Sequence, residues 1–283
     1  MTKFWDLLAL IVPEYIPMAV IGAFVGFVAS TKVLQDTNFL LLIILLSCVV
    51  AGFNTFNAIA DQKIDQINKP QRPLVAKKIT ILQAKQLTVF FYAVALLIAL
   101  TLGTLVLALT MVATVITILY SVKHFYLKKR FVIGNLVGAV FYGIICPLIG
   151  WAITSNLNPP IAIITTLFLL AIGLSFLKDF EDVVGDKKYE IATLPLKLGR
   201  YKSVASIILI ATAAFAYLAY SIYIGALSEK YYLILIFYPL IFFNVYSYKN
   251  PANKVLTSHL FRTTVTIVLG FEITLALITF LPI

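Results

Sequence analysis

The sequence predicts an all-α integral membrane protein, in which nine transmembrane helices form a bundle and residues 1–283 make a single domain. Of the residues, 61% are hydrophobic and only 12% are charged, against roughly 25% charged in a soluble domain. The mean hydropathy is +1.01. The chain also holds a series of apolar runs of roughly 18 residues or more, the length that a helix needs to cross a bilayer. Because lipid offers no partner to an unpaired backbone group, these runs are expected to be helical.

Each apolar run is expected to form one span. The first run, 4–30, is longer than the apolar part of a cleaved signal and is followed by another run, so it is interpreted as a spanning helix. Pro70 and Pro73 end the helix that continues from the second run, because proline lacks the backbone donor that a helix needs. Charged loops separate most of the other runs. The expected spans are 7–29, 39–59, 84–102, 104–122, 131–153, 159–177, 203–224, 231–248 and 263–282.

The positions of the basic residues support this division. Of the 22 Lys and Arg residues, 20 fall before the first span or in the loops after spans two, four, six and eight, and only Lys32 and Lys230 fall on the other side. The positive-inside rule then predicts a multi-pass cell-membrane protein with a cytoplasmic N-terminus and an outside C-terminus. Orientation and attraction to anionic lipid account for most of the net charge of +10. Nucleic-acid binding is not expected, because the basic residues are divided among short loops.

Acidic residues gather in two clusters, both in the predicted cytoplasmic caps. Asn57, Asp61 and Asp65 follow the second span at i, i+4, i+8, so on a helix they form one polar ridge about 12 Å long. Asp182 and Asp186 repeat the i, i+4 spacing after the sixth span, one turn beyond Asp179. These two Asp-rich motifs make the chain look like a weak repeat of helical hairpins.

Each aspartate pair alone could be a solvated helix end, but two facing pairs would need neutralisation. Two like charges 4 Å apart repel by about 4 kcal/mol at an effective dielectric of 20. Oxygen ligands without nearby His or Cys favour a hard ion, so Mg²⁺ is the expected cofactor, bound together with substrate phosphates. The adjacent Lys and Arg residues fit a metal–diphosphate complex better than a bare cation site. A divalent-cation transporter or channel and a scaffold protein remain alternatives.

Two further groups have structural interpretations. Cys48 and Cys146 lie within apolar runs, where a thiol behaves as a small hydrophobic group, so neither a disulfide nor a thiolate metal site is expected. Glu272 lies in the ninth span, where an unpaired charge costs about 2.5–3.5 kcal/mol. Either a hydrogen bond to a neighbouring helix or a polar contact inside the bundle is expected for it.

The motifs resemble those of the UbiA-type intramembrane prenyltransferases. The segment NAIADQKIDQINKPQRPL (57–74) resembles the first Asp-rich motif of that family, and KDFEDVVGD (178–186) resembles the second. The nine-span layout and the two cytoplasmic caps match as well, so the resemblance covers nearly the whole chain. The sequence departs from the family pattern at Ala58, at Val12–Tyr15 and at Val75-Ala76.

The resemblance implies Mg²⁺-dependent transfer of a polyprenyl group from its diphosphate to a lipophilic acceptor. Within the family, the motif pair is most similar to archaeal enzymes that add a second geranylgeranyl chain to geranylgeranylglyceryl phosphate. Aromatic, quinone or chlorin-type acceptors are the alternative. The isoprenoid tail would lie between helices and reach membrane lipid sideways.

The resemblance also implies roles for individual residues. The metal would be held by four aspartates with Asn57 as a ligand or orienting group: Asp61, Asp65, Asp182 and Asp186. A second set of residues would contact the diphosphate. In this set Arg72, together with Lys123 or Lys128, would neutralise the leaving group, and Asp179 would lie nearby.

Overall fold

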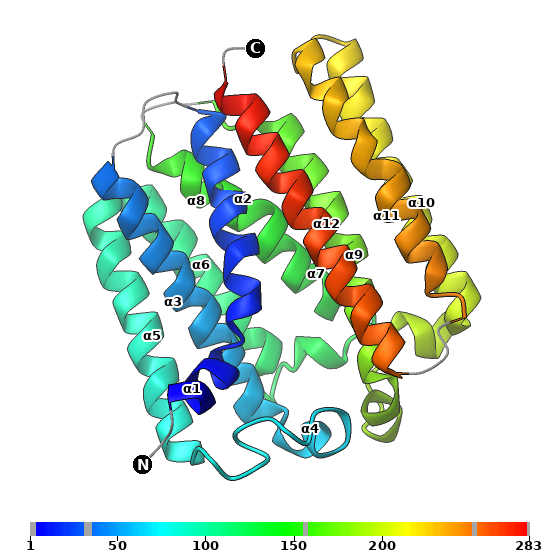
Figure 1. The fold of residues 1–283 in the computed structure, drawn as a ribbon. Helices are drawn as coiled ribbons and strands as arrows, with labels where there is room; N and C mark the ends of the chain where they lie inside the picture. Colours follow the sequence, from blue (N-terminus) through cyan, green and yellow to red (C-terminus); the bar gives the residue numbers. More distant parts are fainter. Residues whose placement is uncertain (1–3, 31–35, 155–157, 251–253, 282–283) are drawn as a thin grey trace.

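The computed structural model describes residues 4–30, 36–154, 158–250 and 254–281, and every regular element in these ranges is a helix (Figure 1). Helices α1 and α4 lie at one end of the bundle, and the last turn of α12 lies at the other (Figure 1). In chain order the elements are α1 (Phe4–Ile11), η1 (Pro13–Tyr15), α2 (Ile16–Val28), α3 (Asp36–Ala60), α4 (Gln62–Asn68), α5 (Ile81–Leu102), α6 (Thr104–Ser121), η2 (Leu127–Lys129), α7 (Ile133–Val140), η3 (Phe141–Ile145), α8 (Cys146–Ala152), α9 (Ile161–Lys188), α10 (Leu194–Tyr223), η4 (Glu229–Ile236), α11 (Phe237–Ser247) and α12 (Lys254–Phe280).

The division into spans agrees with the sequence. Within the described ranges, eight helical segments are long and apolar enough to cross a membrane, and a bent pair at the N-terminus makes nine if it is counted as one span. Lys3 and Lys32, which contributed to the charge asymmetry, lie outside the described residues.

The first span is broken rather than continuous over 7–29. Its two parts meet at 45°, and the break falls at Val12, whose φ of 50° and ψ of 68° are left-handed. A β-branched residue rarely adopts that conformation. Pro13 follows directly and fixes the start of η1. A salt bridge between Lys78 and Asp6 (3.2 Å) holds α1 against the loop after α4. The break directs Tyr15 toward the inside of the bundle, where it lines a cavity described below.

Helix α9 extends well beyond the expected sixth span, 159–177. It has 28 residues, or about 42 Å at 1.5 Å per residue, whereas a hydrocarbon core is about 30 Å thick. The second Asp-rich motif therefore lies on the last turns of the spanning helix itself rather than on a separate cap. The first motif differs, because α3 ends at Ala60 and the short helix α4 carries the chain onward.

The hairpin of α5 and α6 is fixed at the start of α5 and at the turn between the two helices. Thr80 caps α5: its hydroxyl accepts a hydrogen bond from the Gln83 N–H, and the Gln83 side chain accepts one from the Thr80 N–H. Gly103 joins the two helices with a φ of 127°, a value that side-chain-bearing residues rarely adopt.

Helices α2 and α8 touch backbone to backbone. A Cβ at Gly26 would lie 1.9 Å from the Pro147 carbonyl oxygen, and a Cβ at Gly150 would lie 1.8 Å from the Ala23 carbonyl oxygen. In lipid, where no hydrophobic effect drives helices together, such small residues allow the close packing that stabilises a helix pair.

The two largest apolar clusters fill most of the bundle. Residues of α9 to α12 form one and residues of α3, α5, α6 and α8 form the other, while α2 contributes to both. Cys48 and Cys146 are buried free thiols, as expected. Glu272 is 5% exposed, its Oε1 atom faces α2 near Gly22, and its Oε2 atom has no hydrogen-bond partner among the described residues.

Candidate functional site

The first Asp-rich motif forms a continuous polar ridge across the junction of α3 and α4. The Asp61 N–H donates to the Asn57 carbonyl at 2.9 Å and the Asp65 N–H donates to the Asp61 carbonyl at 2.8 Å. The i, i+4, i+8 spacing is therefore kept through the break. Asp61 is 3% exposed and Asp65 is 4% exposed, so neither is a solvated helix end.

An amide clamp joins the two motifs. The Asn68 side chain at the end of α4 donates to the Asp182 carbonyl at 3.0 Å and accepts from the Gly185 N–H at 2.8 Å. Because a Cβ at Gly185 would lie 2.5 Å from the Asn68 amide nitrogen, only glycine fits here without displacing that side chain. The clamp sets α4 against the last turns of α9 and brings the two sets of aspartates to one cavity.

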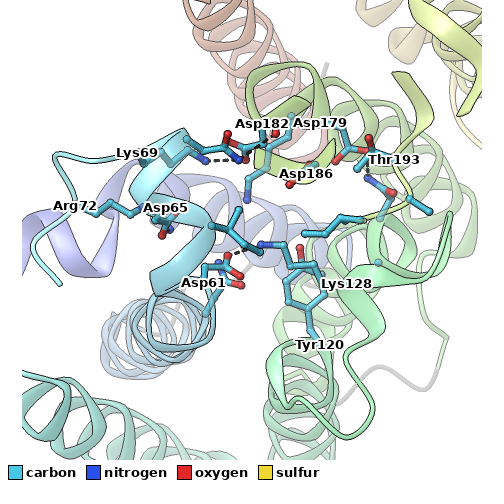
Figure 2. Close-up of a pocket in the computed structure, with 18 residues that line it drawn as sticks. Asp61, Asp65, Lys69, Arg72, Tyr120, Lys128, Asp179, Asp182, Asp186 and Thr193 are labelled. Atoms are coloured by element: carbon cyan, nitrogen blue, oxygen red, sulfur yellow. Dashed lines mark hydrogen bonds and ion pairs between the residues drawn. The ribbon is translucent and has the colours of Figure 1, made fainter. Parts of the chain in front are cut away.

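Figure 2 shows this polar cavity, which opens between α4, α9 and the loop after α6. Its lining combines both motifs with groups from α6 and α7 and from the loops after α4, α6 and α9. The lining residues are Asn57, Asp61, Ile64, Asp65, Asn68, Lys69, Arg72, Tyr120, Lys128, Gly134, Asn135, Lys178, Asp179, Asp182, Asp186, Ile191, Ala192 and Thr193.

Three of the aspartates are paired with cations. Arg72 contacts Asp65 at 2.6 Å, Lys69 contacts Asp182 at 2.8 Å, and Lys128 forms an ion pair with Asp61. Burial by itself would lower the pKa of Lys128, but the Asp61 carboxylate outweighs burial and holds that pKa above its usual range. Burial by itself would also lower the pKa of Arg72, but the Asp65 carboxylate outweighs burial and raises that pKa. Both cations therefore stay charged although they are largely withdrawn from water.

Several carboxylate oxygens of the cavity are left without partners. Oδ1 of Asp61 and Oδ1 of Asp182 are buried and have no hydrogen-bond partner in the described part of the chain. Asp186 is 4% exposed and forms no ion pair within the described ranges. Buried oxygens of this kind suit a hard divalent cation such as Mg²⁺. Among the described residues no three acidic, His or Cys side chains converge on one point, so water and substrate oxygens would complete its coordination.

The structure brings together most of the residues that the sequence singled out. Asn57, Arg72, Lys128 and Asp179 line the cavity with the four aspartates, whereas Lys123 is exposed and is not part of the lining. The difference arises in the loop after α6, where a left-handed turn at Tyr126 leads into η2 and directs Lys128 inward.

Sequence reasoning gave no site role to several groups that line the cavity. Asn135 donates to Oδ2 of Asp179 at 3.0 Å and also to the Ser175 carbonyl at 3.0 Å. Lys69 and Asn68 stand in the INKP segment of the first motif, which was a usable signal. Lys178 opens the second motif, which was also a usable signal. Tyr120 and Thr193 had no such signal, because only the tertiary fold places them here.

A second, largely apolar cavity adjoins the first. The two cavities share Asn57, Tyr120, Gly134, Asn135, Lys178 and Asp179. The rest of the second lining comes mainly from η1, α2, α3 and α9, with single contributions from α7, α12 and η3: Tyr15, Met18, Phe53, Asn54, Gly138, Tyr142, Ala171, Leu174, Ser175 and Phe261. We call this space the apolar chamber. The site thus joins a charged end and an apolar end.

Comparison with known proteins places this architecture among prenyltransferases. Residues 19–269 match the UbiA prenyltransferase family. The chain is 30% identical to digeranylgeranylglyceryl phosphate synthase from Sulfolobus acidocaldarius over 191 residues, 67% of this chain and 68% of that protein. A solved structure from work on digeranylgeranylglyceryl phosphate synthase in membranes has a TM-score of 0.73 and 25% identity over 99% of both chains. A UbiA homologue from Archaeoglobus fulgidus, bound to GPP and Mg²⁺, shares the fold with a TM-score of 0.73, at 19% identity over 96% of this chain and 99% of that one.

Proposed function

Because the chain belongs to the UbiA prenyltransferase family, we propose that it transfers a geranylgeranyl group from its diphosphate to geranylgeranylglyceryl phosphate, with Mg²⁺ as cofactor. One observation carries this proposal: unpartnered carboxylate oxygens from both motifs line a polar cavity that adjoins an apolar chamber. The polar cavity suits a diphosphate with its metal, and the chamber suits an isoprenoid chain. The named acceptor is supported by the similarity to digeranylgeranylglyceryl phosphate synthase.

Asp61, Asp65, Asp182 and Asp186 would hold the metal, with Asn57 orienting the first motif. When bound, Mg²⁺ would stabilise the negative charge that develops on the leaving diphosphate. Arg72 and Lys128, now paired with aspartates, are the cations that would turn to the diphosphate oxygens. Their positive charge would then stabilise the negative charge that develops on the leaving group.

In the transfer step, the bond between the allylic C1 of the donor and the diphosphate oxygen breaks, and the electron pair leaves with the diphosphate. The acceptor hydroxyl oxygen bonds to C1 and loses its proton. Asp179 is the carboxylate at the junction of the two cavities that forms no ion pair within the described ranges, so it is the group that would take this proton. Asn135 would hold it in position. The apolar chamber would shield the allylic cation from water.

The protein is an integral membrane protein. Residues of α4 line the polar cavity, and α4 lies at one end of the bundle (Figure 1). We propose that this end, together with the N-terminus, is cytoplasmic and that the C-terminus is outside. The support is the concentration of basic residues in the loops at the end of the bundle that carries the site.

The test uses purified protein in liposomes with geranylgeranyl diphosphate and an equal mixture of geranylgeranylglyceryl phosphate and 4-hydroxybenzoate. Mass spectrometry should find the diether phosphate as the main product, formed only with Mg²⁺ or Mn²⁺ and abolished by a chelator. Preferential prenylation of the aromatic ring would refute the acceptor. Turnover that a chelator does not affect would refute the metal-dependent mechanism.

A further inference from the structure

Lys178 stands at the junction of the two cavities. It belongs to α9, lines both the polar cavity and the apolar chamber, and is only partly exposed. Its Nζ atom lies 5.2 Å from the centre of the Tyr15 ring. The break at Val12 starts the short η1 turn that places this ring inside the bundle. The cation is thus held over an aromatic face at the point where charged and apolar surfaces meet.

Lys178 differs from the other cations of the polar cavity. Lys69, Arg72 and Lys128 each form an ion pair with an aspartate, whereas Lys178 has no ion pair and no hydrogen bond to a carboxylate in the ranges 4–30, 36–154, 158–250 and 254–281. A cation withdrawn from water without an ion-pair partner is unfavourable, and an aromatic face compensates only part of that cost. An anion bound beside Lys178 would offset the rest of the cost of withdrawing this cation from water.

The surroundings indicate what kind of anion would bind. On the chamber side the neighbouring lining is apolar, with Met18, Leu174 and Phe261. An anion that reaches Lys178 from that side must be attached to an apolar chain. The donor diphosphate has a separate set of groups in the polar cavity, where Asp65 pairs with Arg72 and Asp61 pairs with Lys128, and neither cation lines the apolar chamber.

We propose that Lys178, supported by Tyr15, binds the phosphate of an amphiphilic acceptor and so selects phosphorylated over uncharged acceptors. The inference rests on the proposed transferase function, since it assumes that the acceptor carries a phosphate. Lys178 would place the acceptor hydroxyl beside Asp179, the next residue on α9. Its role is to recognise the acceptor, not to stabilise the leaving group.

The experiment compares wild type with Lys178→Gln, using geranylgeranylglyceryl phosphate and its dephosphorylated alcohol as acceptors. Loss of a hydrogen bond to a charged group should raise the KM for the phosphate acceptor about tenfold or more. The KM for the alcohol and the KM for the donor should each stay within about twofold. Lys188→Gln, on the same helix but exposed and outside both cavities, is the matched control and should behave as wild type.

A binding measurement without donor separates this inference from the proposed function. In detergent micelles, Lys178→Gln should lose about tenfold in affinity for the phosphate lipid but not for the alcohol, even if no transfer occurs with either. Tyr15→Phe should keep the affinity and Tyr15→Leu should lower it for the phosphate lipid only. Equal losses for both lipids, or a raised donor KM with an unchanged acceptor KM, would overturn the assignment of Lys178.

Discussion

The amide clamp between the two motifs can be tested with Gly185→Ala. The new Cβ would lie 2.5 Å from Nδ2 of Asn68 and 2.6 Å from its Cγ and Oδ1, well short of the 3.4 Å at which ordinary contact begins. Overpacking of this kind costs about 1–3 kcal/mol, and loss of the two clamp hydrogen bonds adds about 1 kcal/mol each. Alanine in place of glycine within a helix returns about 1 kcal/mol. The net loss of unfolding free energy should be about 2–4 kcal/mol.

The decisive comparison is made in an Asn68→Ala background. There the amide that would clash is gone, so Gly185→Ala should be neutral or stabilising by up to about 1 kcal/mol. The two substitutions should therefore be coupled by about 3 kcal/mol. Reversible unfolding in mixed detergent micelles, followed by circular dichroism, measures all four proteins. Mg²⁺-dependent turnover should fall in Gly185→Ala as well, because a displaced α4 moves Asp65 away from α9.

Gly173→Ala is the matched control on the same helix. A Cβ at Gly173 would meet only a methyl group of Ile207, at an ordinary 3.7 Å, so this variant should be as stable as wild type or slightly more so. Two outcomes would show that the clamp does not hold the two motifs together. In one, Gly185→Ala lowers the free energy of unfolding equally in the wild-type and Asn68→Ala backgrounds. In the other, Gly185→Ala raises the free energy of unfolding of the protein that keeps Asn68.

Two further predictions concern the metal set and the membrane orientation. Asp186→Asn should abolish Mg²⁺-dependent transfer with a change of less than about 1 kcal/mol in unfolding free energy, because no cation is paired with this carboxylate in the described ranges; near-normal turnover would remove Asp186 from the metal ligands. A cysteine in place of Lys188, at the site end of the bundle, should react with an impermeant maleimide only from the cytoplasm, and one in place of Ala226, beyond α10, only from outside; the reverse pattern would invert the proposed topology.

The sequence predicted the parts of the site that depend on local geometry. The helical period aligned Asn57, Asp61 and Asp65, and all three line the same cavity. The apolar runs predicted the spans for a similar reason. Whether a run can span the bilayer depends only on its own length and on the bilayer thickness, not on contacts with distant segments. Membership of a prenyltransferase family also removes the channel and scaffold alternatives that the aspartates alone had left open.

The contacts between distant segments could not be predicted in this way. The Lys69–Asp182 pair joins residues 113 positions apart, and the period of one helix does not say which helix faces it. Lys123 and Lys128 looked equivalent in sequence, but the left-handed turn at Tyr126 separates their positions. The break at Val12 could not be predicted for another reason. A β-branched residue is among the least expected residues at a positive φ.

The contact between α2 and α8 limits how lipid substrates reach the chamber. Where Gly26 meets Pro147 and Gly150 meets Ala23, no side chains stand between the two helices, so no rotamer change can open a gap there. Parting them would expose bare backbone to lipid and forfeit the packing that holds them. Under the proposed function, the isoprenoid chain of a substrate would therefore enter and leave through another wall of the bundle. Substitution of either glycine by alanine would act on substrate exchange only through the distortion of this fixed pair.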